Sequence, residues 1–270
     1  MKPFRSFSAL AFFPLALLLG VTVAQAQTII DDFNTGSDSA WTRVDPLGNA
    51  TYSFPAGNTY RIQAPISPSP GTVGAARAGA IREDATFGDF DITVDLVGWD
   101  NSSSTHQSIG IVARVGDVGA GTTDGYFFHY DPFGSNGHPG LWIETITDEA
   151  PSSINFQQIA ALDPALGYRL EFSGTGDNLT GRVYALSDLS TVLYEIDAID
   201  STYTSGYAGL LVADQGRLQT GNQSADATFD NFSVTAVPEP SASVLIGGVA
   251  AGVSALYFRR RRTPKAIECA

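Results

Sequence analysis

The sequence predicts an all-β protein in which two antiparallel sheets pack face to face. Apolar and polar residues alternate with a period of two in many short segments, a pattern typical of strands with one buried face. Glycine, proline, asparagine and aspartate interrupt these segments throughout residues 27–236, where no stretch keeps helical spacing. Many short strands with one polar face each favour two packed sheets.

The alternation is clearest in residues 90–96, 109–115 and 168–172, where every second side chain is apolar. In a strand these side chains share one face, so we expect half-buried strands in all three segments. Less regular strands are expected at residues 59–64, 125–130, 141–146, 179–186, 206–212 and 228–235. Residues 64–71 and 116–124 are predicted loops, and no internal repeat is found.

The predicted domain is strongly acidic. Residues 27–236 hold eight arginines and no lysine against 26 aspartates and glutamates, a net charge near −18, whereas the whole chain carries −13. A surface of this charge repels nucleic acid and anionic lipid, so nucleic acid is excluded as a partner. The only cysteine is Cys269, so residues 27–236 form no disulfide, and a domain of this length can bury a sufficient core without one.

The first 26 residues have the three parts of a secretory signal peptide. Lys2 and Arg5 supply the positive start, residues 9–24 are apolar, and residues 24–26 read Ala-Gln-Ala. This A-x-A site predicts cleavage by signal peptidase before Gln27. The alternative is an N-terminal membrane anchor, against which the A-x-A site argues.

The other end of the chain predicts a single membrane-spanning helix. Residues 241–258 carry no charge and are long enough to cross a bilayer as a helix. Arg259, Arg260, Arg261 and Arg262 follow at once and should remain cytoplasmic by the positive-inside rule. The domain then lies on the far side of the membrane, in agreement with the signal peptide.

Pro238, Glu239 and Pro240 stand immediately before the apolar span. This motif, the span and the arginine cluster together resemble the PEP-CTERM sorting signal of exopolysaccharide-producing Gram-negative bacteria. The resemblance covers residues 237–262 and leaves a tail, residues 263–270, that is longer than usual. It implies that an exosortase-type protease removes a transient membrane anchor and sends the protein to the cell surface or the medium. A permanent single-span anchor is the alternative.

Short motifs in residues 27–236 resemble the concanavalin A-like (laminin G-like) jelly roll. They are Asp31-Asp32-Phe33 with Trp41, Gly125-Tyr126-Phe127-Phe128 after Arg114, Gly206-Tyr207-Ala208-Gly209-Leu210, and Thr228-Phe229-Asp230-Asn231-Phe232. The resemblance implies the fold and says little about activity. An immunoglobulin-like sandwich is the structural alternative.

Glu195, Asp197 and Asp200 are similar to the E-x-D-x-x-E signature of laminarinase-type glycoside hydrolases. The third position is an aspartate here, which shortens the reach of the family's general acid/base. The motif also lies just before the expected closing strands, where the resemblance implies a solvated turn. We expect residues 195–200 to form a solvated strand end. We therefore predict no catalytic residue and no enzyme. A glycoside hydrolase or polysaccharide lyase on the same fold is the alternative.

Phe229 and Phe232 can both face the core only if the strand bulges at Asp230-Asn231. The opening strand lies beside the closing strand in this fold, which brings Asp32 toward Asp230. Carboxylate oxygens suit calcium, and related jelly rolls often hold a structural calcium nearby. Asp32 and Asp230 are thus the predicted calcium ligands. His106, His129 and His138 lack the spacing of a zinc site.

Aromatic residues interleave with charged ones along three of the expected strands. Sugars present apolar C–H faces and hydroxyl rims, which suit a flat ring beside carboxylate and guanidinium groups. The predicted glycan-contact residues are Arg114, Tyr126, Tyr130, Asp131, Trp142 and Glu144. The expected function is a non-enzymatic protein of the envelope or extracellular matrix that contacts polysaccharide. A purely structural matrix protein without a ligand is the alternative.

The two ends of the chain predict processing at both termini. The mature protein should begin at Gln27 and lack the segment beyond the Pro-Glu-Pro motif, because each end carries the signal for its own protease. Intact-mass measurement of the native protein checks this. A species that retains Met1 would contradict signal cleavage, and one that retains Ala270 would contradict anchor removal.

Overall fold

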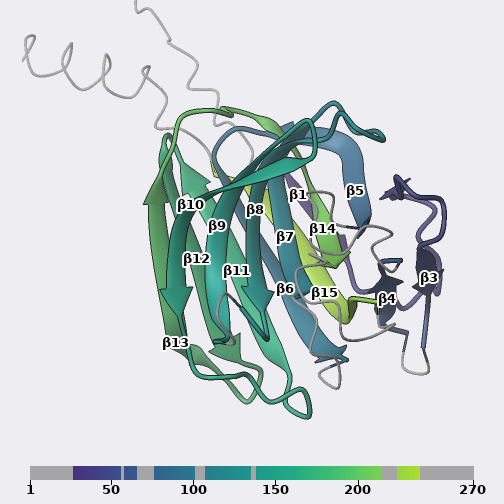
Figure 1. The fold of residues 1–270 in the computed structure, drawn as a ribbon, viewed down its shortest axis with the longest axis vertical. Coiled ribbons are helices and arrows are strands. Elements are labelled where there is room, and N and C mark those ends of the chain that lie inside the picture. Colours follow the sequence, from purple (N-terminus) through teal and green to yellow (C-terminus); the bar gives the residue numbers. More distant parts are fainter. Residues whose placement is uncertain are drawn as a thin grey trace, which may run out of the picture. The chain divides into compact units, whose positions relative to one another are not determined.

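The computed structural model describes residues 27–55, 58–65, 76–100, 107–134, 138–214 and 224–237. Within these ranges the chain forms strands, turns and loops arranged as two antiparallel sheets that pack face to face (Figure 1). The predicted two-sheet, all-β architecture is confirmed. The predicted signal peptide and membrane-spanning segment lie outside the described residues. Inside them, no helix is long and apolar enough to cross a membrane.

The back sheet has the strand order β13-β12-β11-β6-β15-β4-β3, with β1 also paired to β15. Its strands are β1 (Thr28–Asp31), β3 (Thr51–Ser53), β4 (Tyr60–Gln63), β6 (Phe90–Trp99), β11 (Tyr168–Thr175), β12 (Asn178–Ala185), β13 (Asp188–Ile199) and β15 (Asp226–Ala236).

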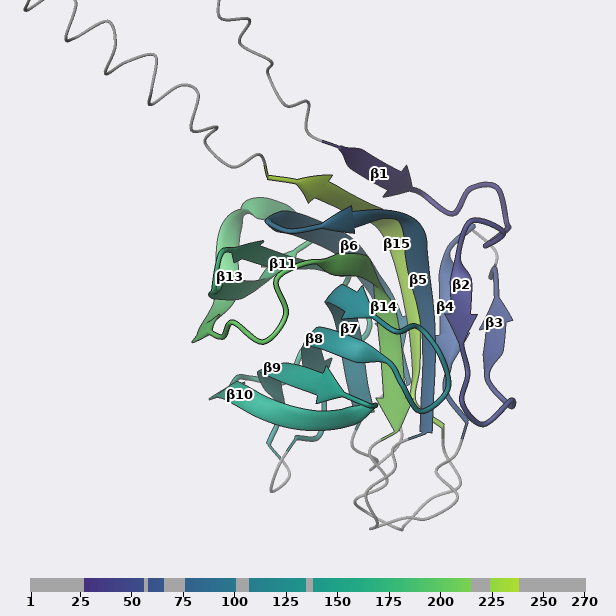
Figure 2. The same cartoon turned by 90° about the horizontal axis from the view of Figure 1, so that it is seen from above.

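The front sheet has the strand order β10-β9-β8-β7-β14-β5-β2. Its strands are β2 (Thr42–Val44), β5 (Ala76–Phe87), β7 (Gln107–Gly116), β8 (Asp124–Asp131), β9 (Gly140–Thr147), β10 (Ala150–Gln158) and β14 (Gly206–Asp214). Seen from above, this sheet curves, and its face turned away from the back sheet lies on the inside of the curve (Figure 2). We call it the concave face.

The core lies between the two sheets. Every second residue of β6, from Phe90 to Leu96, is fully buried, as are Leu170 and Phe172 on the neighbouring β11. Burying one such side chain contributes about 1.5–3 kcal/mol. The predicted alternation in these two strands is confirmed.

Two long strands were missed by the sequence analysis because their exposure does not alternate. In β10 most side chains are exposed, and in β13 the first six are all exposed. Both are edge strands, so packing against the core does not impose an alternating pattern of apolar side chains on them. The solvated strand end expected at residues 195–200 is confirmed: β13 continues to Ile199, and Glu195, Asp197 and Ile199 are exposed.

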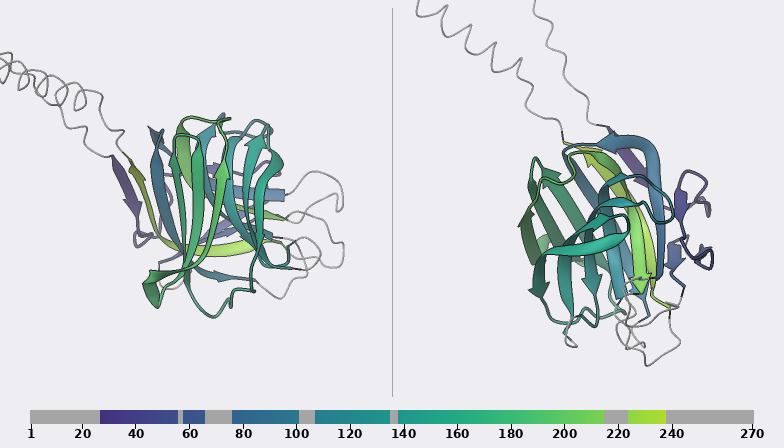
Figure 3. Two further views of the ribbon diagram at one scale, coloured as in Figure 1. Left: turned by 90° about the vertical axis from the view of Figure 1, so that its left-hand side faces the viewer. Right: turned by 45° about the horizontal axis from the view of Figure 1, so that its top comes forward.

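The opening strand β1 and the closing strand β15 pair as predicted (Figure 3). Their register places Asp31 opposite Phe232. The Asp31 carboxylate accepts hydrogen bonds from the Phe33 backbone N–H at 2.9 Å and from Trp41 Nε1 at 2.8 Å, which fixes both rings. The predicted bulge is also confirmed. The β15 register shifts after Asp230, Asn231 has φ of 49°, and Phe229 and Phe232 are both fully buried.

Arg114 ties three loops together at one end of the sandwich. Its guanidinium is 2% exposed and donates hydrogen bonds to the carbonyls of Gly88, Tyr203 and Gly176 at 3.0, 2.8 and 2.8 Å. Arg114 was expected to orient a glycan, and that expectation is wrong. Register irregularity in β7 and a φ of 49° at Arg114 accompany the turn of its side chain toward the loops.

Arg114→Lys should lower the free energy of unfolding by at least about 2 kcal/mol. A single ammonium cannot reach three carbonyls that lie in different directions, and each buried carbonyl left unpaired costs about 1–3 kcal/mol. Thermal denaturation measures the change. Arg43→Lys is the control, because the Arg43 side chain is 49% exposed and its contacts are an ion pair with Asp38 and the face of the Tyr52 ring, with no buried carbonyl among them. Equal losses in both variants would show that Arg114 does not hold the loops.

Candidate functional site

A row of stacked rings crosses three neighbouring strands on the concave face. Phe127 and His129 belong to β8, Trp142 to β9 and Phe156 to β10. The register places His129 opposite Trp142, and Trp142 opposite Phe156. Successive ring centroids are 4.5, 5.5 and 4.4 Å apart, within the range of favourable aromatic contact. We call these four residues the aromatic row.

Exposure along the aromatic row rises toward the sheet edge. Phe127 and His129 are buried and Trp142 is 8% exposed, whereas Phe156 is 41% exposed. Gly140 makes room for this end of the row, since a Cβ there would lie 2.4 Å from the Phe156 ring. Phe156 is therefore the ring that an external molecule can reach, and Trp142 supports it from below.

Two polar side chains at the aromatic row have few partners: His129, which belongs to the row, and Glu144, which lies next to it. His129 is fully buried, and neither of its ring nitrogens makes a hydrogen bond. Its Nε2 lies 3.2 Å from Glu144 Oε2, close enough for an ion pair but without the alignment of a hydrogen bond. The Glu144 side chain is 12% exposed. A buried polar group without a partner costs about 1–3 kcal/mol, so this pair is a candidate for ligand or water contact.

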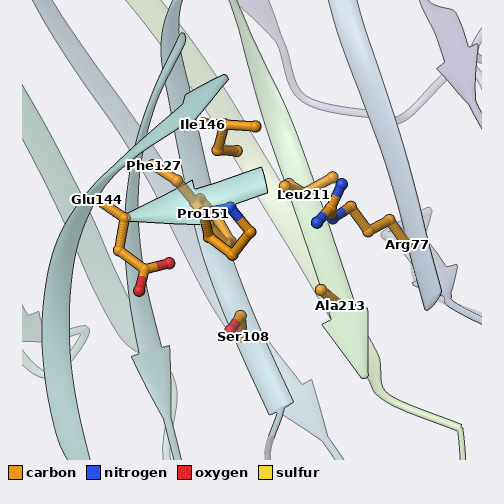
Figure 4. Close-up of a pocket in the computed structure, with 8 residues that line it drawn as sticks. All are labelled: Arg77, Ser108, Phe127, Glu144, Ile146, Pro151, Leu211 and Ala213. Carbon is orange, nitrogen blue, oxygen red and sulfur yellow. The ribbon is translucent and has the colours of Figure 1, made fainter. Parts of the chain in front are cut away.

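A small pocket opens between Glu144 on β9 and Arg77 on β5 (Figure 4). Phe127, Ile146, Pro151 and Leu211 form its apolar walls. Its volume is about 20 Å³, enough for one water-sized group and too small for a sugar ring. Any sugar at this face must therefore lie across the surface, with at most a substituent inside the pocket.

The turn between β9 and β10 reaches across the concave face. Glu149 in this turn lies 3.3 Å from the Arg77 guanidinium, and its other oxygen accepts a hydrogen bond from the Gly121 backbone N–H at 2.9 Å. Three strands separate β9 from β5 in the sheet, so this contact requires the sheet to curl. Burial lowers the pKa of Arg77, and the carboxylates of Glu149 and Glu144 oppose that shift.

The structure separates the six predicted glycan-contact residues. Trp142 and Glu144 lie on the concave face, as described above. Tyr126 and Tyr130 lie in the core with no exposed surface, and burial raises the pKa of each phenol to about 12. Asp131 is 2% exposed and accepts hydrogen bonds from the backbone N–H groups of Phe133 and Gly134. The expected glycan contact by Tyr126, Tyr130 and Asp131 is therefore wrong.

The reason for the error is that β8 is aromatic at successive positions, reading Tyr-Phe-Phe-His-Tyr from Tyr126 to Tyr130. Both of its faces are buried, so the sequence alone does not show which set points outward. Phe127 and His129 take the concave face instead. Phe156 was missed because β10 has no alternating pattern to indicate a strand.

The three carboxylates of the laminarinase-like motif are engaged elsewhere. Glu195 pairs with Arg182 across β12 and β13 at 2.6 Å, and Asp197 accepts a hydrogen bond from Thr180 at 2.7 Å. Asp200 accepts a hydrogen bond from the Tyr126 hydroxyl at 2.7 Å. All three belong to the back sheet or to the turn that follows it, so they do not line the concave face.

Asp32 and Asp230, the predicted calcium ligands, lie close enough for the charge of Asp32 to raise the pKa of Asp230. No group of three or more His, Cys, Asp or Glu side chains among them is placed to hold a metal ion. Asp32 caps the Asn34 backbone N–H, and the neighbouring Asp95 is held by Arg169 through two contacts of 2.7 and 3.0 Å. Burial raises the pKa of Asp230, and the charges of Asp95 and Asp32 raise it further.

Solved structures share this architecture. They include basic winged bean lectin with Tn-antigen, with a TM-score of 0.52, 9% identity and coverage of 78% of this chain and 98% of that chain. Lectin UEA-II complexed with galactose has a TM-score of 0.51 and 10% identity, and the match covers 78% of this chain and 99% of that chain. The exoplasmic/lumenal domain of VIP36 in its Ca²⁺/Man-bound form has a TM-score of 0.53 and 12% identity, and the match covers 79% of this chain and 91% of that chain.

No family model and no curated protein sequence matches this chain. At such low identity the likeness to solved structures concerns the fold alone. The described domain is thus a two-sheet jelly roll of the concanavalin A-like kind, as the sequence motifs predicted. The fold does not by itself define a ligand.

Asp230→Asn should raise the melting temperature slightly at neutral pH, by about 1 °C. A folded-state pKa above the unfolded value means that ionised Asp230 is disfavoured in the folded state, so stability falls as pH rises through that pKa. The gain should vanish below the usual pKa range of aspartate, where Asp230 is protonated. Asp188→Asn should give no gain, because hydrogen bonds from Ser190 favour the ionised form and lower its pKa.

A calcium ion at Asp230 would reverse this outcome. The substitution would then remove a ligand and lower the melting temperature, and a chelator would destabilise the wild-type protein. Melting curves of both proteins with and without chelator separate the two accounts.

Proposed function

We propose that this protein is a non-enzymatic domain that contacts polysaccharide through the exposed end of the aromatic row. The observation that carries the proposal is the continuous stack from Phe127 to Phe156, which ends in a 41% exposed ring beside the Glu144 carboxylate. A flat aromatic face next to a polar oxygen suits the C–H face and hydroxyl rim of a sugar.

The packing beneath Phe156 indicates a ligand-binding surface and not a ring that is exposed by chance. Its ring packs on Trp142 at 4.4 Å, and Trp142 lies nearly parallel to His129, with 4° between the ring planes. The Phe156 backbone N–H donates a hydrogen bond to the Asn155 side-chain oxygen at 2.8 Å. The Asn155 side-chain amide in turn donates to the Asp197 carbonyl at 2.7 Å, which joins β10 to β13. A ring fixed in this way loses little conformational entropy when a ligand binds.

The structural comparisons support a sugar as the class of ligand. The winged bean lectin, UEA-II and VIP36 structures were determined with Tn-antigen, galactose and mannose, respectively. Hydrolysis by a retaining glycosidase needs two carboxylates about 5–5.5 Å apart at the site. Glu144 is the one acidic residue among the eight that line the pocket, and Glu149 in the neighbouring turn is paired with Arg77, which favours binding over catalysis.

The proposed place of action is the cell surface or the extracellular matrix of a Gram-negative bacterium. The signal peptide at residues 1–26 and the sorting motif at residues 237–262 support export, with signal peptidase and an exosortase-type protease as processing partners. The membrane is then contacted only through the C-terminal helix, and only transiently.

Phe156→Ala should weaken glycan binding at least about tenfold while leaving the fold intact. Open single-domain sites bind weakly, so the wild-type Kd should be on the order of 10⁻⁴ M. Screening on an array of neutral oligosaccharides, followed by calorimetric titration of the strongest, measures the change. Leu193→Ala is the matched control, because Leu193 is 42% exposed on β13 in the back sheet and should not affect binding.

A substitution at Trp142 provides a second test of the same stack. Because it is 8% exposed, Trp142→Ala should lower both the melting temperature and the affinity, whereas Phe156→Ala lowers only the affinity. Retained glycan binding in Phe156→Ala, with the melting temperature unchanged, would contradict a contact at this end of the aromatic row.

A further inference from the structure

The positive charges of the described domain are all engaged in internal contacts. Each described arginine of residues 27–236 lies within 4 Å of a carboxylate. These arginines are Arg43, Arg61, Arg77, Arg82, Arg114, Arg169 and Arg182. The eighth, Arg217, lies outside the described residues, and this part of the sequence has no lysine. The described surface therefore offers an anionic ligand no unpaired cation.

On the concave face the unbalanced group is a carboxylate. Arg77 pairs with Glu149, and the charge of Glu144 also acts on it across the pocket, so two carboxylates face one guanidinium. The His129 ring is the polar group that lies next to Glu144. His129 is fully buried, and neither nitrogen makes a hydrogen bond. Glu144 is 12% exposed and lines the pocket, so a donor from outside can reach it.

The size of the pocket limits what can approach Glu144. A volume of about 20 Å³ holds one water-sized group, which is also the size of an ammonium. Phe156 and Glu144 are diagonal neighbours on adjacent strands, since Phe156 pairs with Trp142 and Ser153 pairs with Glu144. Such positions lie about 7–8 Å apart, a separation that one sugar unit and its substituent can bridge.

We propose that the glycan contacted by this face carries free amino groups and that Glu144 receives an ammonium while the sugar ring stacks on Phe156. The inference rests on the proposed glycan contact and specifies the charge of the ligand. Uronate polymers are excluded by repulsion, because the domain carries a net charge near −18 and its described guanidinium groups are paired.

The experiment compares three oligosaccharides of equal length that differ in charge. They are an oligomer of glucosamine, the same oligomer fully N-acetylated, and an oligogalacturonate, each titrated calorimetrically into the full-length protein in mildly acidic buffer that keeps the amino groups protonated. The amino oligomer should bind at least about tenfold more tightly than the acetylated one at low salt. Its advantage should shrink toward about 0.15 M salt as screening grows. The uronate should not bind.

Two variants separate a specific contact from general attraction of a polycation to an acidic protein. Glu144→Gln should reduce the preference for the amino oligomer at least about threefold, because the amide oxygen still accepts a hydrogen bond from a hydroxyl but cannot form an ion pair with an ammonium. Glu195→Gln removes the same unit of charge from the back sheet, where Glu195 pairs with Arg182, and should leave the preference intact. If Glu144→Gln fails to fold, Glu144→Asp keeps the charge with a shorter reach and should lose part of the preference.

The outcomes distinguish this inference from the proposed function. Equal binding of the amino and acetylated oligomers, or an equal effect of both glutamine variants, overturns the role of Glu144 and leaves glycan contact standing. Binding of the uronate overturns the charge assignment. Failure of all three oligomers, together with a negative array of neutral glycans, overturns the proposed function itself.

Discussion

The central strands β7 and β8 of the front sheet are buried on both of their faces, and much of the structure follows from this constraint. Along β8, Tyr126, Phe128 and Tyr130 point into the core while Phe127 and His129 point the other way. One face is buried by the back sheet, but the concave face must be covered by other means. Curvature and the contact of Glu149 with Arg77 bury Phe127 and Leu211, which are 3% and 6% exposed. The concave face is no longer covered near β10, and there Phe156, the last ring of the aromatic row, is exposed to solvent.

The charged residues also fall into two groups, those that stabilise the scaffold and the one that is left at the candidate site. Arg114 and Asp131 lie near strand ends and bind loop backbone, so they stabilise the scaffold that holds the sheets in register. Arg77 stabilises the curl of the front sheet although burial disfavours its charge. Because Arg77 pairs with Glu149, Glu144 is left at the pocket without a guanidinium in direct contact. The electrostatic character of the candidate site is thus a consequence of how the fold is held together.

Sequence patterns predicted those elements in which one face alone meets the core. The alternation in β6 and β11 is clear because their other faces are polar, and the spacing of Phe229 and Phe232 predicted a bulge because both rings had to be buried. The same reasoning failed at β8, where aromatic residues on both faces hide the direction of each side chain. It failed at β10 and β13 because exposed edges impose no pattern. The contact of Arg77 with Glu149 joins residues 72 positions apart, which no local pattern indicates.

The central claim is that a glycan contacts the protein at the β9–β10 edge of the concave face. Hydrogen–deuterium exchange of the protein with and without a saturating oligosaccharide tests this most directly, since it locates the contact without any substitution. The account predicts slower exchange in residues 140–158, with no change in residues 178–199 on the back sheet. Protection confined to residues 178–199, or no protection in residues 140–158 under conditions where binding is measured, would contradict it.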